Sequence, residues 1–326
     1  MELVCPAGTP SALKAALNAG ADVVYVGFRD ETNARNFPGL NFSPEELETA
    51  VSLAHSMGSR IYVAINTYPQ AGNIAPWYNA IDTAARIGVD AVILADIGLL
   101  DYAQTNHPDL RRHLSVQASA SNPEAINFYK KAFDIQRIVL PRVLTVKEIS
   151  SLISEIDVET EVFAFGGMCV MAEGRCSLSS YITGQSPNMN GVCSPASHVA
   201  YENKRGKLVS KLGDFTINSF PANEPAGYPT LCKGRFSGPD GDPSYLFEEP
   251  TSLNVLALLP ELMDAGVKAL KIEGRQRGKA YVSQVVSAYR TAIDAVKRGE
   301  PAPFIDLGGI TEGTRSTSGA YQKNWR

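Results

Sequence analysis

Short apolar runs, rich in β-branched residues, alternate with amphipathic segments along most of the chain. Each run is apolar almost throughout, as a strand covered on both faces of a sheet requires. The expected strands are Leu3–Cys5, Val23–Val26, Ile61–Ile65, Ala91–Ala95, Leu114–Gln117, Arg137–Leu140, Val162–Phe165 and Ala269–Ile272. Eight such strands, each followed by a helical segment, predict a parallel (β/α)8 TIM-type barrel. A doubly wound open sheet is the alternative.

The starts of the expected helices are marked by capping residues. Thr9-Pro10, Ser43-Pro44 and Asn122-Pro123 each place a capping side chain before a proline at the first helical position. Ser43 with Glu46, and Thr145 with Glu148, have the spacing of a capping box. These local signals support the alternation of strands and helices.

One long segment interrupts this alternation. Residues 167–250 are rich in Gly, Pro, Asn and Ser, and contain a potential strand pair at Leu208–Leu212 and Thr216–Ile217. The next expected helix begins near Thr251. Long segments of this kind are usually functional, and this one leaves the end of a barrel strand where such folds place their chemistry. We expect a single barrel over residues 1–300 that includes this insertion, and a tail over 301–326 that packs on the barrel.

The composition is that of an ordinary folded protein. Of 326 residues, 44% are hydrophobic and 20% are charged, with a formal net charge of −4. This balance lacks the basic footprint of a dedicated nucleic-acid binder, so we expect no nucleic-acid partner. The first residues carry no basic segment, and the longest apolar runs are too short to span a bilayer. We therefore expect a cytoplasmic protein that is not membrane-embedded.

Four of the five cysteines lie in the insertion, at Cys169, Cys176, Cys193 and Cys232. Thiolates are soft ligands for zinc, copper(I) or iron–sulfur clusters. Structural zinc sites usually bring cysteines in close pairs, and these four are widely spaced. The spacing favours a cluster over zinc, with ordinary buried thiols as a third interpretation. Cys5 ends the first strand and stands outside the set.

Polar side chains follow the other expected strands and would meet at the mouth of a barrel. Arg142 and Arg275 are suited to hold a carboxylate, and Glu273 or Asp96 to move protons. The remaining substrate-binding candidates are Arg35, Asn66 and Gln117. Individually, each arginine or glutamate has an equally good explanation as a member of a stabilising ion pair. The sequence contains no HExxH motif and no recognisable Ser–His–Asp arrangement.

The run from Glu161 to Ser179, with Gly166, Cys169 and Cys176 at matching positions, resembles the signature of the collagenase-like peptidase family of unassigned mechanism. Gly167 stands where that signature usually has Ser or Ala. Further similarity to the branch of this family that works in ubiquinone biosynthesis lies in Cys5-Pro-Ala-Gly8, Asn33-Ala-Arg35, Gly191-Val-Cys193-Ser-Pro195, Leu231-Cys232-Lys-Gly234, Glu249-Pro-Thr-Ser-Leu-Asn254 and Lys271-Ile-Glu-Gly-Arg275.

The resemblance implies a [4Fe–4S] cluster on Cys169, Cys176, Cys193 and Cys232. It also implies O2-independent hydroxylation of the ubiquinone ring, performed together with a paralogous cluster protein as a heterodimer. Prephenate is implied as the oxygen donor, and a lipid-carrier protein as the source of the quinone precursor. Other members of the family hydroxylate bases in RNA, so an RNA base hydroxylase is the alternative. A collagenase-like peptidase is the third.

Overall fold

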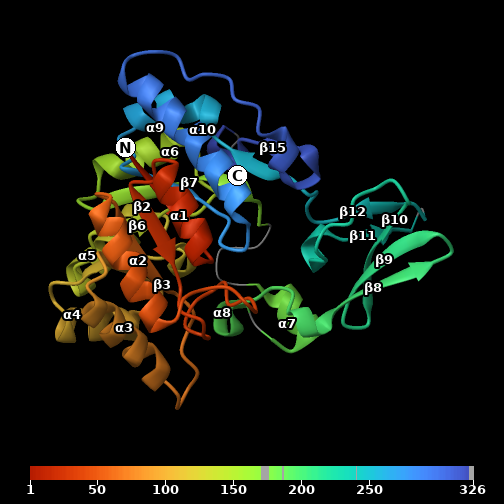
Figure 1. Cartoon of the computed structure of the whole chain (residues 1–326), viewed down its shortest axis with the longest axis horizontal. Helices are drawn as coiled ribbons and strands as arrows, with labels where there is room; N and C mark the ends of the chain where they lie inside the picture. Colours follow the sequence, from red (N-terminus) through yellow and green to blue (C-terminus); the bar gives the residue numbers. More distant parts are fainter. Residues whose placement is uncertain (170–175, 186, 240, 323–326) are drawn as a thin grey trace.

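The computed structural model describes residues 1–169, 176–185, 187–239 and 241–322 (Figure 1). Eight parallel strands form a closed barrel in which each strand pairs with the next along the chain and β14 returns to pair with both β1 and β7. The barrel strands are β1 (Glu2–Pro6), β2 (Val23–Val26), β3 (Arg60–Ile65), β4 (Ala91–Leu94), β5 (Arg111–Leu114), β6 (Arg137–Val139), β7 (Glu159–Gly167) and β14 (Ala269–Ile272). The predicted TIM-type fold is confirmed.

Helices cover the outside of this barrel (Figure 1). They are α1 (Pro10–Asn18), α2 (Pro44–Ser56), α3 (Ala75–Ile87), α4 (Ile97–Asn106), α5 (Pro123–Phe133), α6 (Val146–Ser154), α9 (Leu259–Asp264) and α10 (Lys279–Lys297). The side chains of Thr9, Ser43 and Asn122 accept the predicted capping hydrogen bonds, and both predicted capping boxes are present. Among the described residues, no helix has the length and apolar character needed to cross a membrane.

The fifth strand begins and ends earlier than the sequence predicts. It covers Arg111–Leu114, and Gln117 lies after it in a short 3-10 turn at Val116–Ala118. The prediction left Arg111, Arg112 and His113 out of this strand, because strands of a sheet that is covered on both faces are normally apolar. Here the guanidinium of Arg112 is satisfied by carbonyl oxygens, including those of Phe133 and Leu110 at 3.0 and 2.8 Å.

The insertion leaves the carboxyl end of β7 and carries its own small sheets. It contains α7 (Ser177–Thr183), α8 (Pro187–Asn190), β8 (Val199–Lys204), β9 (Lys207–Leu212), β10 (Phe215–Phe220), β11 (Arg235–Ser237) and β12 (Pro243–Tyr245). Strands β8, β9 and β10 form an antiparallel sheet, and β11 pairs with β12. These strands project to one side of the barrel, while α7 and α8 lie under its mouth (Figure 1). Residues 170–175 of the family signature, including Gly174, lie outside the described residues.

The prediction of a helix that begins near Thr251 is wrong. The chain there forms β13 (Ser252–Asn254), which pairs antiparallel with the extended end of β7, and the helix α9 starts only at Leu259. Leu253 is buried, and the hydroxyl of Tyr289 donates to the Asn254 side chain at 2.9 Å. The strand therefore provides partners for backbone groups of β7 that extend beyond the barrel.

The tail returns across the barrel mouth. Strand β15 (Ser316–Thr317) pairs with β13, and the hydroxyl of Tyr321 donates to the carbonyl oxygen of Phe163 at 2.8 Å. The carboxylate of Glu312 pairs with the ammonium of Lys233, which belongs to the insertion. It also lies 3.4 Å from the guanidinium of Arg277. This carboxylate thus links the tail, the insertion and the loop after β14. Trp325 lies outside the described residues.

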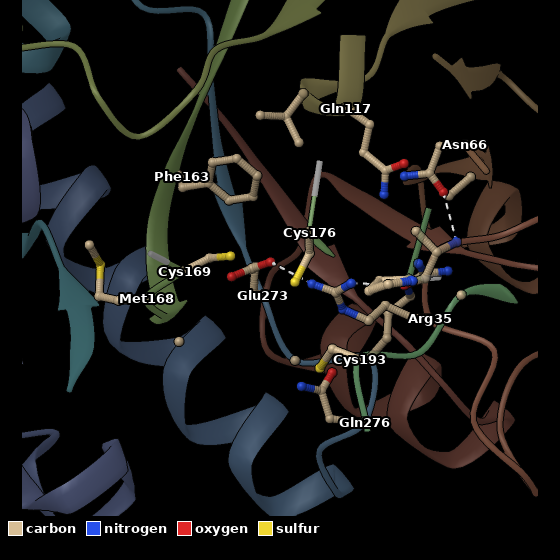
Figure 2. Close-up of a pocket in the computed structure, with 18 of the residues that line it drawn as sticks. Arg35, Asn66, Gln117, Phe163, Met168, Cys169, Cys176, Cys193, Glu273 and Gln276 are labelled. Carbon is tan, nitrogen blue, oxygen red and sulfur yellow. Dashed lines mark hydrogen bonds and ion pairs between the residues drawn. The ribbon is translucent and has the colours of Figure 1, made fainter. Parts of the chain in front are cut away.

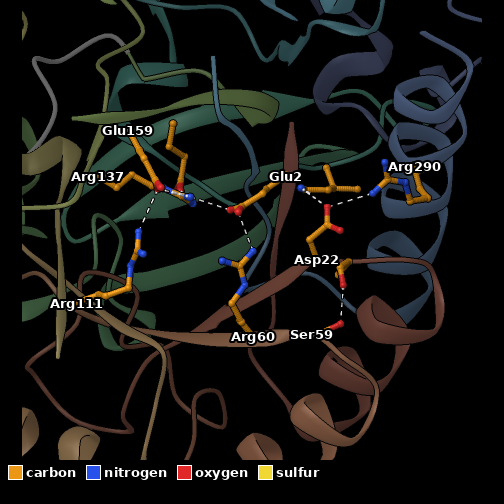
Figure 3. Close-up of polar contacts among 11 residues, drawn as sticks. Glu2, Asp22, Ser59, Arg60, Arg111, Arg137, Glu159 and Arg290 are labelled. Atoms are coloured by element: carbon orange, nitrogen blue, oxygen red, sulfur yellow. Dashed lines mark hydrogen bonds and ion pairs between the residues drawn. The ribbon is translucent and has the colours of Figure 1, made fainter. Parts of the chain in front are cut away.

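The amino-terminal end of the barrel is filled by an ion-pair network (Figure 3). Arg137, whose side chain is 1% exposed, binds the carboxylates of Glu2, Glu159 and Glu161 at 2.8, 2.6 and 3.4 Å. Glu2 lies on β1, Glu159 and Glu161 lie on β7, and Arg137 lies on β6. A buried guanidinium is tolerated only when it is paired in this way. The network closes the end of the barrel that lies opposite the insertion.

Candidate functional site

A cavity of about 270 Å³ opens at the carboxyl end of the barrel and extends into its interior. The ends of the barrel strands, the insertion and the tail all contribute to its wall (Figure 2). The predicted residues that line it are Arg35, Asn66, Gln117, Arg142, Cys169, Cys176, Cys193, Cys232, Glu273 and Arg275. Residues far apart in the sequence are therefore brought together, and Asp96 is the predicted residue that does not line this cavity.

The four cysteines of the insertion reach the cavity from four separate segments. Cys169 follows β7, Cys176 precedes α7, and Cys232 lies in a short 3-10 turn. Cys193 follows Gly191, whose φ of +81° and close approach to the Asn33 carbonyl leave no room for a side chain. Figure 2 shows the side chains of Cys169, Cys176 and Cys193 arranged around the same polar centre.

A single metal ion would require at least three ligand side chains close to one point. In the described part of the chain, no three His, Cys, Asp or Glu side chains converge as one metal ion requires. A single zinc ion needs its sulfurs about 2.3 Å from one point, whereas a cluster carries its thiolates on separate irons and keeps them further apart. Burial, together with the nearby Cys169 and Cys193, raises the pKa of Cys232 to about 12. Binding of a metal there must release the thiol proton.

Cys5 is separated from this group. Its side chain is fully buried in the core and donates weakly to the Leu3 carbonyl at 3.8 Å. Burial raises the pKa of this thiol well above its usual value. A neutral core thiol of this kind packs as a small apolar group.

Glu273 occupies the centre of the polar wall. Its carboxylate pairs with Arg142 and lies 3.7 Å from the guanidinium of Arg35. Burial alone would raise the pKa of Glu273, but Arg142 and Arg35 outweigh this effect and hold the pKa below its usual value. The guanidinium carbon of Arg142 lies 3.5 Å from the centroid of the Phe163 ring, which fixes its position by a cation–π contact.

Arg275 is a buried residue of the cavity wall, with 4% of its surface exposed. Its guanidinium donates to the side-chain oxygen of Asn33 at 3.2 Å, and burial lowers its pKa to about 10. It remains a cation at neutral pH. Arg35, Arg142 and Arg275 thus line the same cavity as the Glu273 carboxylate, and cations outnumber carboxylates among these four side chains, which favours anions.

Asn66 and Gln117 complete the wall in different ways. Asn66 accepts a hydrogen bond from the Ala34 amide at 3.0 Å and donates to Ser115 at 3.3 Å, so it holds the loop that carries Arg35. The side-chain oxygen of Gln117 is buried and has no hydrogen-bond partner within the described residues. A buried acceptor without a partner is costly, so this oxygen is available for a donor on a bound molecule.

Asp96 caps a helix, and the expectation that it moves protons in the cavity is withdrawn. Its carboxylate accepts a hydrogen bond from the Leu99 amide at 3.1 Å, at the start of α4. Aspartate is a favoured residue at this position because it satisfies an otherwise unpaired amide. The sequence pattern of a polar residue after an apolar strand does not distinguish a cap from a catalytic group.

We expect Asp96→Ala to lower the free energy of unfolding by about 1 kcal/mol, the usual cost of losing such a cap. The measurement is urea unfolding of the two proteins purified without air. Iron content and any hydroxylation activity should be unchanged. A large loss of activity with unaltered stability would instead return Asp96 to the site.

Two further residues contribute to the wall of the cavity. Lys271, in the middle of β14, lines the cavity, and the only signal for it is an isolated charge within an apolar strand. The second is Gly167, which differs from the family signature. A Cβ at Gly167 would lie 2.9 Å from the carboxylate of Glu312, so the tail occupies the space that Ser or Ala would need.

Comparison with known proteins identifies the family of this chain. Residues 8–316 match the model of peptidase family U32, and the chain belongs to this family. It is 30% identical over 318 residues to tRNA hydroxylation protein P of Escherichia coli, covering 92% of this chain and 69% of that protein.

Two further relatives carry different names. The Porphyromonas gingivalis protein named collagenase is 30% identical over 310 residues, covering 91% of this chain and 66% of the relative. The 23S rRNA 5-hydroxycytidine C2501 synthase of Escherichia coli is 30% identical over 309 residues, covering 93% of this chain. This chain spans only 41% of the length of that synthase. Relatives named for hydroxylation and for proteolysis thus match most of this chain.

Proposed function

We propose that this chain is the iron–sulfur subunit of an O2-independent hydroxylase that acts on the ubiquinone ring. This is the role of the ubiquinone biosynthesis protein UbiU, which its sequence motifs resemble. The partner would be a UbiV-like paralogue in a heterodimer, and a lipid-carrier protein would deliver the quinone precursor. The observation that carries the proposal is that four thiols and four guanidinium groups line one cavity.

Cys169, Cys176, Cys193 and Cys232 would hold a [4Fe–4S] cluster, which supplies one-electron chemistry at the cavity when bound. The residues of the chain itself bind and orient the substrates. Arg142 and Arg275 would hold the carboxylates of prephenate, the proposed oxygen donor, because guanidinium groups pair with carboxylates in a fixed geometry. Glu273 positions Arg142, and Glu312 of the tail contributes to the cavity wall.

RNA base hydroxylation is the second candidate, and the names of the relatives favour it. Two of them are a tRNA hydroxylation protein and an rRNA hydroxycytidine synthase. The names support a hydroxylase without identifying its substrate. The net charge of −4 gives this chain little general attraction for RNA phosphates.

A peptidase function has less support in the structure. Peptide hydrolysis requires an activated nucleophile or a metal-bound water. No histidine lines the cavity within the described ranges. His55 and His107 pair instead with Asp90 and Asp82 at 2.9 and 2.6 Å, at partly exposed positions.

The proposal is tested by measuring quinones and modified RNA bases in a deletion strain grown with and without oxygen. We expect ubiquinone to disappear only without oxygen, and to return with the wild-type gene but not with Cys193→Ala. Hydroxylated RNA bases should be unaffected. Intact ubiquinone together with a missing hydroxylated base would show that the substrate is RNA.

We expect Arg142→Gln to weaken the binding of prephenate roughly 10- to 150-fold. Loss of a hydrogen bond between charged groups costs about 1.5–3 kcal/mol. The substitution also removes the cation that pairs with the carboxylate of Glu273. Calorimetric titration of the anaerobic protein measures the change. Arg298→Gln is the control, because Arg298 pairs with Glu300 on the exposed surface. Equal affinity of the two variants would exclude Arg142 as a ligand for the donor.

A further inference from the structure

The floor of the cavity carries a lysine that the proposed function does not use. Lys271 projects from β14 into the barrel, where 7% of its surface is exposed, and it lines the cavity. Its ammonium lies 2.6 Å from a carboxylate oxygen of Glu161 and 4.0 Å from the centroid of the Tyr25 ring. Lys271 thus contacts Glu161 and Tyr25 and forms part of the cavity wall.

The surrounding charges favour loss of a proton from this lysine. Glu161 shares its carboxylate with Arg137, which links Lys271 to the ion-pair network at the base of the barrel. The cations of the network are Arg60, Arg111, Arg137 and Lys271, and its carboxylates are Glu2, Glu159 and Glu161. Positive charge is therefore in excess, and arginine does not give up its proton in proteins.

Lys271 is the cation of this ion-pair network that can lose a proton and become neutral. Burial lowers the pKa of Lys271, although Glu161 opposes the effect, and the charges of Arg275 and Arg137 lower it further. A buried lysine beside other cations is a recognised way to obtain a nucleophilic amine near neutral pH. The carboxylate of Glu161 is within hydrogen-bond distance and is suited to accept the proton.

A guanidinium group lies beside the same aromatic ring. The guanidinium carbon of Arg275 is 5.7 Å from the centroid of Tyr25, the ring that Lys271 also contacts. The Tyr25 hydroxyl is held by the Ile272 carbonyl at 2.9 Å, so the ring is a fixed support for both cations. A guanidinium binds a carboxylate, and a neutral amine attacks a carbonyl carbon. A molecule with these two groups on adjacent carbons is a 2-oxo carboxylate.

We propose that Lys271 forms an imine with a 2-oxo carboxylate whose carboxylate group is held by Arg275. This deepens the proposed function, on which it rests for the natural ligand, because prephenate contains a 2-oxo carboxylate. Glu161 takes a proton from the ammonium of Lys271, and the free amine forms a C–N bond to the carbonyl carbon. The carbonyl oxygen gains one proton from the nitrogen and one from Glu161 and leaves as water. The protonated imine then pairs with the Glu161 carboxylate.

The experiment is reductive trapping. The full chain, purified without air, is incubated with pyruvate and cyanoborohydride, and the protein is examined by intact mass and peptide mapping. We expect one reduced adduct per chain, located on Lys271. Lactate, which has no carbonyl carbon beside its carboxylate, should give none. Absence of an adduct with pyruvate, or an adduct confined to other lysines, would overturn the proposal.

Two variants separate chemistry from folding. Lys271→Arg keeps a cation beside Glu161 but has no amine that forms a stable imine, so the adduct should disappear while circular dichroism is unchanged. Lys268→Arg is the control, because Lys268 is exposed just before the same strand, and its adduct should equal that of the wild type. An adduct that persists in Lys271→Arg would refute the assignment, and peptide mapping of the wild type decides the matter if Lys271→Arg does not fold.

Failure of this inference and failure of the proposed function give different results. Without an adduct, but with ubiquinone lost in the deletion strain, the function stands and the imine does not. With an adduct on Lys271, but with ubiquinone intact in the deletion strain, the 2-oxo carboxylate site stands and the quinone substrate is wrong.

Discussion

Replacing Cys232 by alanine should remove most of the iron from the protein and abolish its visible absorption. The four insertion cysteines line one cavity from separate segments, and Cys232 is the member contributed by the far end of the insertion. Without its thiolate, one iron of a cubic cluster has no protein ligand and exchanges readily with solvent. We therefore expect the iron content to fall several-fold, from about four atoms per chain.

Cys5→Ala is the matched control for this prediction. Cys5 is fully buried in the core and does not line the cavity. Its substitution should leave the iron content and the absorption spectrum unchanged. Both variants are purified without air, and iron is determined colorimetrically beside the protein concentration. If Cys5→Ala lost as much iron as Cys232→Ala, the assignment of ligands to the insertion would be wrong.

Arg137→Ala should lower the free energy of unfolding by about 3–5 kcal/mol, the range found when one partner of a buried ion pair is removed. The side chain of Arg137 is 1% exposed and binds three carboxylates, of which Glu161 is itself 1% exposed. Removing the guanidinium leaves these carboxylates with fewer partners in a region that water reaches poorly. Urea unfolding of the anaerobic protein measures the loss.

Arg111→Ala separates this effect from the loss of any arginine in the network. Arg111 pairs with Glu159 at 3.2 Å, but its side chain is 41% exposed, so water replaces much of the interaction. Its removal should cost less than about 1 kcal/mol, as is usual for exposed pairs. Similar losses in the two variants would show that burial of Arg137 contributes little to stability.

Local signals predicted most of the barrel. The capping residues Thr9, Ser43 and Asn122 act through hydrogen bonds to amides three residues away, so sequence spacing alone is informative. Strands such as Val23–Val26 are apolar throughout because both faces are covered. β5 departs from this rule. The buried guanidinium of Arg112 donates to the carbonyl oxygen of Leu110 nearby in the sequence and to that of Phe133 in a distant segment.

The site was predictable in part, for a similar reason. Polar residues at strand ends meet at one edge of a parallel sheet whatever the details of packing, which brought Arg35, Arg142 and Glu273 together. Whether such a residue caps a helix or faces the cavity depends on its side-chain rotamer, and Asp96 shows that the sequence does not reveal this. Lys271 lies within a strand, and its role depends on Glu161, a residue distant in the sequence.

The measurement that tests the central claim most directly is the content of iron, acid-labile sulfide and zinc in one sample of wild-type protein purified without air. A [4Fe–4S] cluster on the four insertion cysteines predicts about four irons and about four sulfides per chain, with no stoichiometric zinc. One zinc per chain without sulfide, or a colourless protein without metal, would contradict the account.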